Sequence, residues 1–404
     1  MFPKLFLWLR IVFFNLLFVA FIGLILRYKI LFSLPFIDQK HLLHGHSHFA
    51  FTGWVTQVLM VLLIANLSVQ KQIDQFPKYT ILLYVNLIAA YGMLIAFTIQ
   101  GYAFFSILFS TLSIFVSFFF AVIYWKDLNK LPIKKIASYW FKAALLFNAI
   151  SSIGAFALAI MMANKIVHQN WYLLSVYFFL HFQYNGWFFF ACMGLMMEKI
   201  TAIYLKRLLL KKIFWLFAIA CIPAYFLSAL WLNLFNWVFA IVVISALLQG
   251  VAWYFLLTIL LPLRNKLSAQ MPLVAKWLLS LSAIALSIKL FLQIFSTIPS
   301  LSELAFGFRP IVIGYLHLIL LGVITLFIIG YIVAEKFISL SKLVNWGIVV
   351  FTIGVLLNEC FLMIQGVTAL SYIIVPYMNE ALIFTAAILF TGLLLLNLGI
   401  KKQT

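Results

Sequence analysis

Long apolar stretches, separated by short polar links, run along the whole chain. Twelve of them are about 20 residues long, which is enough for a helix to cross the ~30 Å hydrocarbon layer of a bilayer. They lie near residues 5–28, 44–68, 78–100, 103–125, 138–161, 171–197, 210–231, 236–262, 272–296, 309–333, 344–366 and 377–399. This pattern predicts an all-α polytopic membrane protein of about twelve transmembrane helices. We expect a single membrane-embedded domain over residues 1–404 and no soluble domain.

Composition and charge support this fold class. The chain is 67% hydrophobic and 9% charged, whereas about a quarter of the residues of a soluble domain are charged. If the N-terminus is cytoplasmic, all but six of the 27 lysines and arginines fall on the cytoplasmic side; the exceptions are Arg27, Lys29, Lys40, Lys165, Lys289 and Arg309. The positive-inside rule therefore predicts that both termini are cytoplasmic. We expect a multi-pass protein of the inner (cytoplasmic) membrane of a cell, with the lipid bilayer as partner. The net charge of +19 then reflects topology and does not indicate nucleic-acid binding.

The cysteines and prolines give less information. Cys192, Cys221 and Cys360 all fall in apolar stretches at no ligand-like spacing, so we predict neither disulfides nor a zinc site. Pro223 lies inside the seventh stretch. No convincing internal repeat is evident.

Four of the seven histidines occur within eight residues, in the run HLLHGHSHFAFTGWV. Imidazole is costly in hydrocarbon unless a metal, a heme iron or a polar network holds it. At 100° per residue, His44 and His48 share one helix face, with His41 near it, and His46 points to the opposite side. One face of this cluster is a candidate for a heme ligand. A water-exposed, histidine-rich helix mouth is the alternative.

Two further histidines lie inside apolar stretches. His181 is about ten residues into the sixth stretch and His317 eight residues after Arg309 in the tenth, at depths of about 15 and 12 Å. In the predicted topology both lie in the outer half of the membrane, as the cluster does. This favours one shared site, although each could equally be a satisfied polar residue of the helix bundle. His168 precedes the sixth stretch and is expected to be solvated.

Twelve helices with histidines on the second, sixth and tenth resemble the catalytic subunit of the heme-copper oxidase superfamily, nearest its C-type oxidase and nitric oxide reductase branches. The motifs that carry the resemblance are HSHFAFTGW, LHFQYNGWFFFACMGLMM and GYLHLILLG. It implies a low-spin, bis-histidine heme b between His48 (or His46) and His317, and a copper ligand at His181. The HGHSH run also resembles a twelve-helix family of heme- and copper-containing proteins linked to nitric oxide resistance.

The chain also departs from the family pattern. Tyr315 stands where the tenth helix of the family carries a second histidine, which binds the high-spin heme. The segment FWLFAIACIPAYFLSALWLNLFNW lacks the histidine pair that completes the family's copper site in the seventh helix. A copper centre of three histidines therefore cannot be assembled in the family's way, and the site is expected to be degenerate. Copper or a second heme is a further candidate cofactor, with His181, His44, Tyr184 and Tyr315 as candidate metal ligands. Arg309 is placed to meet heme propionates, or else is a snorkelling interfacial cation.

The predicted function is that of a heme-binding membrane protein in electron transfer, or in the chemistry or sensing of a diatomic gas (O₂ or NO). Only Glu359 among the acids is intramembrane, so no proton pathway is evident. An active terminal oxidase or nitric oxide reductase-like enzyme is the alternative, and a transporter is a less favoured one. The resemblance also implies partners: a cytochrome c-like or quinol electron donor, or other membrane subunits.

Overall fold

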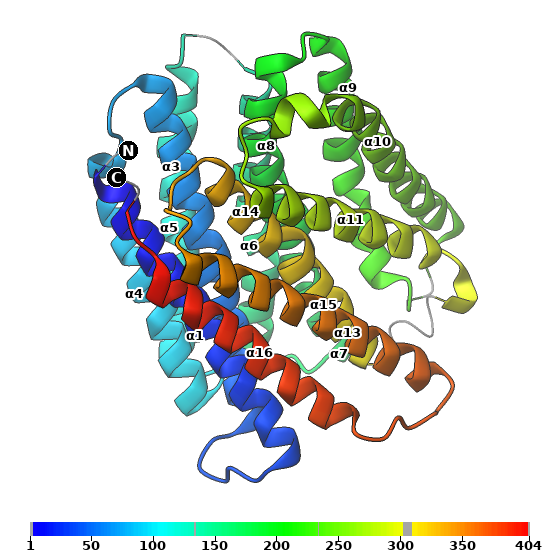
Figure 1. Ribbon diagram of the computed structural model, residues 1–404. Coiled ribbons are helices and arrows are strands. Elements are labelled where there is room, and N and C mark those ends of the chain that lie inside the picture. The colour runs from blue at the N-terminus through cyan, green and yellow to red at the C-terminus, as the bar shows by residue number, and fades with distance from the viewer. Residues whose placement is uncertain (1–2, 133–134, 233, 302–308, 403–404) are drawn as a thin grey trace. The chain divides into compact units, whose positions relative to one another are not determined.

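The computed structural model describes residues 3–132, 135–232, 234–301 and 309–402. Within these ranges the chain forms helices and no strand (Figure 1). The predicted all-α class is therefore confirmed for the described residues.

Eleven helices are long and apolar enough to cross a membrane. They are Lys4–Leu31, Gln39–Lys71, Phe76–Gln100, Phe104–Asn129, Ala137–Ala163, Gln169–Ile203, Asn236–Ser268, Leu273–Phe295, Arg309–Ala334, Lys342–Leu370 and Met378–Gly399. Each coincides with one predicted apolar stretch. The protein is thus a polytopic helical membrane protein, as its hydropathy indicates.

The remaining stretch, predicted as a helix over 210–231, is broken. α9 (Arg207–Cys221) ends two residues before Pro223, and the 3₁₀ segment η3 (Pro223–Ala229) continues at an angle of 42°. Proline has no N–H to donate, and its ring clashes with the preceding helical turn. If the bent pair forms one span, the number of candidate spans rises to twelve.

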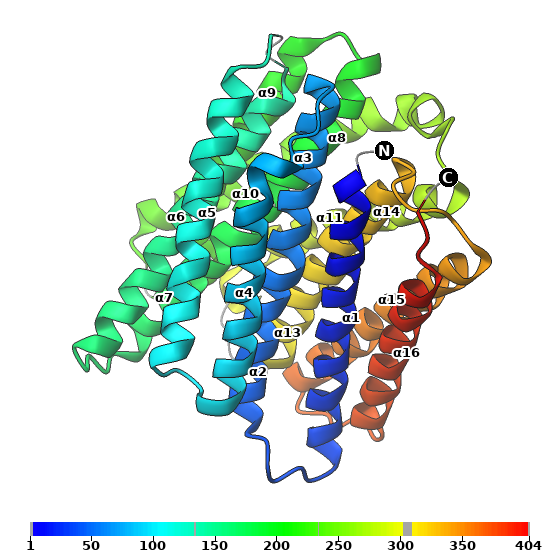
Figure 2. The same ribbon diagram turned by 90° about the vertical axis from the view of Figure 1, so that its left-hand side faces the viewer.

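The chain divides into two compact units. Unit 1 comprises 1–131, 273–278 and 328–404. Its helices are α1 (Pro3–Leu31), α2 (Gln39–Phe49), η1 (Ala50–Thr56), α3 (Gln57–Lys71), α4 (Phe76–Gln100), α5 (Phe104–Asn129), most of α14 (Leu326–Ala334), α15 (Lys342–Leu370) and α16 (Met378–Gly399). In this unit α16 packs between α1 and α15, and α4 packs against both α2 and α5 (Figures 1 and 2).

Unit 2 comprises 132–272 and 279–327. It contains α6 (Ala137–Ala163), α7 (Gln169–His181), η2 (Phe182–Phe188), α8 (Phe189–Ile203), α9, η3, α10 (Asn236–Ser268), most of α11 (Leu273–Phe295), α13 (Arg309–His317) and η4 (Leu318–Thr325). Here α6 packs along α7 and α8, and α9 packs on α10. The expectation that residues 1–404 form a single domain stays a prediction.

The second span holds the histidine cluster and is the most buried of the eleven. In its apolar 18-residue segment 83% of the residues are buried, whereas the corresponding share for α5 is 17%. Gly45 explains how closely α2 approaches α4. A Cβ atom at this position would lie 2.7 Å from Thr98 Oγ1 and 3.1 Å from the carbonyl oxygen of Leu94. The glycine between His44 and His46 is therefore required by helix packing.

Candidate functional site

His44 and His48 face the same side of α2, as their spacing predicts. The His48 ring stacks on Phe97 of α4, with ring centroids 4.2 Å apart and an interplanar angle of 10°. The His44 ring meets Tyr102 edge-on at 4.7 Å, and Tyr102 OH lies 3.4 Å from His48 Nε2. The Nε2 atom of His44 is buried and has no hydrogen-bond partner among the described residues. This aromatic face therefore presents one imidazole nitrogen, Nε2 of His44, that is suited to binding an additional group.

The other two histidines of the cluster contact α1 and the turn after α4. A Cβ added to Gly23 of α1 would lie 3.4 Å from His46 Cε1, so His46 points toward α1. His41 packs over Gly101, whose φ of +63° makes the turn after α4. These contacts confirm the prediction that His46 points to the side of α2 opposite His44 and His48.

Each of these three histidine-bearing helices changes to a π-helix within two residues after its histidine. His181 is the last residue of α7 and is followed by η2, and His317 is the last residue of α13 and is followed by η4. His48 precedes η1 by two residues. π-Helical segments are rare and occur frequently at functional sites. All the π-helices in the described parts of the chain therefore follow these three histidines.

A short sequence motif accompanies this geometry. A glycine follows each of the three histidines at the fifth position, in HFAFTGW, HFQYNGW and HLILLGV; the pairs are His48 and Gly53, His181 and Gly186, and His317 and Gly322. The first two segments also share the phenylalanine after the histidine and the tryptophan after the glycine. This H-x₄-G repeat is local and is visible in the sequence, although it is too short to form a long internal repeat.

Side chains from neighbouring helices satisfy carbonyl groups in η1. A π-helix pairs backbone groups five residues apart rather than four, so some carbonyl groups lose their α-helical partners. Asn15 Nδ2 of α1 donates to the carbonyl oxygen of Gly53 over 2.6 Å, and Asn86 Nδ2 of α4 donates to that of Thr52 over 3.2 Å. Both asparagines are fully buried. In an apolar medium, these amides supply the partners that water cannot.

The same arrangement occurs in the other two π-helices. The Cys221 thiol, at the end of α9, donates to the carbonyl oxygen of Asn185 in η2, with sulfur and oxygen 3.7 Å apart. Ser282 Oγ of α11 donates to the carbonyl oxygen of Val323 in η4 over 2.7 Å. The segments η2 and η4 also contact one another. Neighbouring helices in unit 2 thus support both π-helices.

His181 has a protein partner at each ring nitrogen. Its Nε2 lies 2.8 Å from the carbonyl oxygen of Cys221, and its Nδ1 lies 3.1 Å from Asn185 Nδ2. Since a carbonyl oxygen only accepts, Nε2 carries the proton and Nδ1 accepts from the asparagine. His181 is 2% exposed and Gln183 6%, so the polar residues of this helix face the interior as expected. To bind a metal, His181 must give up one of these hydrogen bonds.

His317 has a different arrangement. Its Nδ1 lies 2.8 Å from the carbonyl oxygen of Ile313, one helical turn earlier. Nδ1 therefore carries the proton, and the lone pair of the neutral imidazole is on Nε2. This arrangement is typical of metal- and heme-binding histidines, whose second nitrogen donates to a carbonyl group that fixes the ring. His317 is half-buried.

The other predicted site residues lie in unit 2, except for the α2 histidines described above. The Tyr184 ring is buried, 6.4 Å from the His181 ring between centroids. Tyr315 is half-buried on α13, two residues before His317, and Arg309 is exposed as the first residue of that helix. Tyr184 therefore lies beside His181 as predicted, whereas the roles given to Tyr315 and Arg309 stay predictions.

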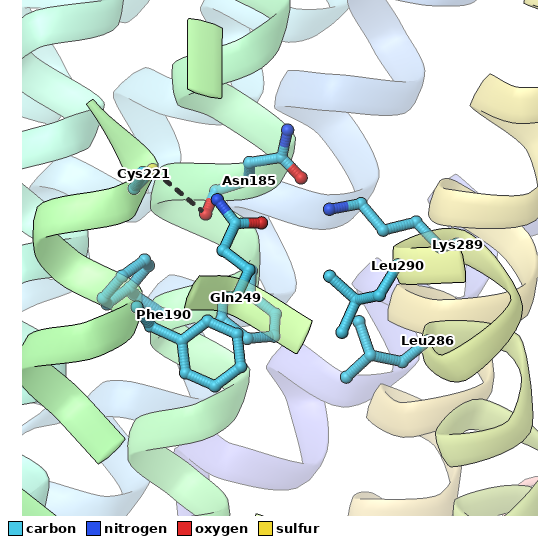
Figure 3. A pocket seen from close by; sticks show the side chains of 9 residues that line it. Asn185, Phe190, Cys221, Gln249, Leu286, Lys289 and Leu290 are labelled. Atoms are coloured by element: carbon cyan, nitrogen blue, oxygen red, sulfur yellow. Dashed lines mark hydrogen bonds between the residues drawn. The ribbon is translucent and has the colours of Figure 1, made fainter. Parts of the chain in front are cut away.

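A small cavity next to His181 was not predicted. Its lining includes Asn185, Cys221, Gln249 and Lys289 among apolar side chains, and it has room for about one water molecule. Figure 3 shows the ammonium group of Lys289 pointing across it toward the Asn185 side chain. Lys289 is 5% exposed and donates to Gln293 Oε1 over 2.6 Å. The sequence placed this lysine near the outer membrane face, but gave no reason to connect it with Cys221.

The structure thus brings two sets of predicted residues together within separate units. His44 and His48 meet on the aromatic face of unit 1, and His181 and Tyr184 lie side by side in unit 2. Nowhere in the described residues do three or more histidines, cysteines or acids converge as a metal-ligand group. The pairing of His48 with His317 stays a prediction, because these residues belong to different units.

A scan against protein-family models and a search among curated proteins find no match for this chain.

Proposed function

We propose that this protein is a heme-binding integral membrane protein that acts in electron transfer or in the chemistry or sensing of a diatomic gas. The observation that carries the proposal is the association of three intramembrane histidines with three π-helices and an H-x₄-G motif. A purely structural histidine has no need of such a feature. Recurrence in three helices favours a common role in ligand binding.

Each unit by itself contains an imidazole that could ligate a heme iron. His317 has its lone pair on Nε2 because Nδ1 donates to Ile313, and the buried Nε2 of His44 shows that α2 also offers an imidazole nitrogen. His48, one turn further along the same face, is the α2 ligand that the family resemblance implies, with His46 as the alternative. When bound, a heme would supply one-electron transfer and an iron centre for a diatomic gas.

The chain's own residues would set the surroundings of that group. Phe97 and Tyr102 hold the α2 imidazoles by stacking and edge contacts, which limits rotation of the rings. The Arg309 guanidinium, exposed at the start of α13, is a candidate to pair with heme propionates. No Cys-x-x-Cys-His sequence is present, so we propose noncovalent heme b.

Optical spectroscopy of the purified protein tests this proposal. We expect oxidised and reduced spectra of a six-coordinate, low-spin b heme. His317→Ala should abolish that spectrum, while His168→Asn, which alters an exposed helix-capping histidine and keeps a capping side chain, should leave it unchanged. Purified protein without heme, or an unchanged spectrum in His317→Ala, would contradict the assignment.

A further inference from the structure

Cys221 and His181 come from different helices of unit 2 and meet at a buried point. The Cys221 Sγ atom lies 4.0 Å from His181 Nε2, and each residue is 2% exposed. A thiol and an imidazole are two of the side chains that bind soft metal ions most strongly. Forty residues separate them in sequence, which is why no ligand-like spacing is visible.

The distance between the two atoms selects the kind of ion. Metal–sulfur and metal–nitrogen bonds of about 2.3 and 2.0 Å place the two ligand atoms about 3.5 Å apart in a tetrahedral site and a little over 4 Å apart in a linear one. The observed 4.0 Å is closer to the linear arrangement. A tetrahedral zinc site would also need further ligands, and no third histidine, cysteine or acid joins the pair in the described residues. A two-coordinate d¹⁰ ion such as Cu(I) fits this geometry.

Asn185 allows His181 to change its donor atom. At present Nε2–H donates to the Cys221 carbonyl oxygen, while Nδ1 accepts from the Asn185 amide. If the imidazole proton moves to Nδ1, a rotated Asn185 amide accepts it through Oδ1, and the lone pair of Nε2 faces Cys221. The hydrogen bond to the Cys221 carbonyl oxygen is lost, so the metal–nitrogen bond must offset that loss.

Lys289 is a buried cation in the same cavity as Cys221. Both residues line the cavity shown in Figure 3, and the lysine is 5% exposed. A buried cation beside a cysteine stabilises the thiolate, which is the form that binds metals. The cavity gives an ion at this place room for about one small additional ligand.

From these observations we infer that Cys221 and His181 form a binding site for a soft monovalent metal ion, Cu(I) in the cell. Binding replaces the thiol proton with the metal, and the proton is released without any oxidation or reduction. The inference goes beyond the proposed heme function and does not require heme to be bound; it takes up copper, the further candidate cofactor of the sequence analysis, and adds a thiolate ligand to His181.

Anaerobic titration with Cu(I), in competition with a chromophoric chelator, tests the site in the full-length protein. We expect a high-affinity ion whose X-ray absorption spectrum contains a sulfur shell. Cys221→Ser should remove the sulfur shell and weaken affinity at least about tenfold. Cys192→Ser, which changes another buried cysteine of unit 2, and Cys360→Ser should change neither.

Several results would overturn the inference. One is a spectrum with nitrogen and oxygen ligands only, which would assign the copper to the α2 histidines. Another is undiminished affinity in Cys221→Ser. The sulfur shell of the unaltered protein is decisive even if the variant does not fold. Heme spectra recorded on the same samples test the proposed heme separately, so a failure of the copper-site inference can be distinguished from a failure of the heme proposal.

Discussion

The Tyr79 hydroxyl donates to Asp127 Oδ2 over 2.6 Å at one end of unit 1, joining α4 to α5. The carboxylate is 2% exposed and also pairs with Lys78 at 2.6 Å and with Lys71 at 3.0 Å. Three helices, α3, α4 and α5, therefore converge on one buried acid. This cluster ties the end of the histidine-bearing second span, at Lys71 of α3, to α4 and α5.

We expect Asp127→Asn to destabilise the protein because two lysine charges lose their buried counter-ion. The lysine side chains are 21% and 45% exposed, so solvent screening reduces the cost to about 1–3 kcal/mol. Thermal unfolding in detergent should show a lower Tm. Asp74→Asn is the matched control, because Asp74 accepts a local hydrogen bond from the backbone N–H of Phe76 and the asparagine side-chain oxygen can accept the same bond. Equal effects of the two variants would contradict this account.

Asn15→Leu tests whether buried amides sustain the π-helix η1. The substitution removes the donor to the Gly53 carbonyl oxygen and the acceptor for Tyr91 OH. An unsatisfied buried polar group costs about 1–3 kcal/mol, so we expect a lower Tm and reduced heme content together. Asn164→Leu, which changes an exposed helix-end asparagine, should alter neither property. Normal stability with normal heme content in Asn15→Leu would show that η1 does not need the amide.

The start of α2 should respond to acid through Asp38. The backbone N–H of His41 donates to its carboxylate over 2.8 Å, and this bond holds the pKa of Asp38 below the ordinary value of 3.8. A lowered folded-state pKa means that the stabilisation is complete above the unfolded-state pKa and disappears as the pH falls through the folded-state value.

Hydrogen exchange of the amides at the start of α2, corrected for intrinsic rates, measures this effect. We expect constant protection above about pH 5 and progressive loss below about pH 4. Asp38→Asn should keep the cap and remove this pH dependence, since the amide does not titrate. An identical acid profile in the variant would assign the loss to another group.

We expect negligible oxygen consumption with artificial electron donors. Tyr315 stands where the heme-copper oxidases carry the histidine that binds the high-spin heme, and the segment around Pro223 lacks the histidine pair of their copper site. We therefore expect neither centre to form in that family's way. Polarographic measurement on heme-loaded protein checks this expectation. Turnover in the usual enzyme range of about 1–10³ per second would instead support the terminal oxidase or nitric oxide reductase alternative.

Hydropathy was sufficient to locate the spans. Lipid offers backbone groups no partner, so each apolar stretch of about 20 residues must become a helix wherever it crosses the bilayer. The break at Pro223 was also encoded locally, by the missing N–H of proline. Its angle and the 3₁₀ form of η3 were not predictable from composition.

The shared face of His44 and His48 likewise followed from helical periodicity, because the two residues are one turn apart. The H-x₄-G motif was present in the sequence, yet its meaning emerged only with the π-helices that follow the histidines. A π-helix depends on donors from other helices, such as Asn15 and Ser282. Sequence spacing within one helix carries no information about them.

By itself, then, the sequence determined the membrane class, the spans and the faces of α2, since these depend on hydrophobicity and helical period over short distances. Only the tertiary structure decided which nitrogen of His181 and His317 carries the proton, and that Cys221 lies beside His181. Such contacts join residues that are far apart in sequence or depend on the fold around them. They arise from how helices pack, and packing is settled by many side chains acting together.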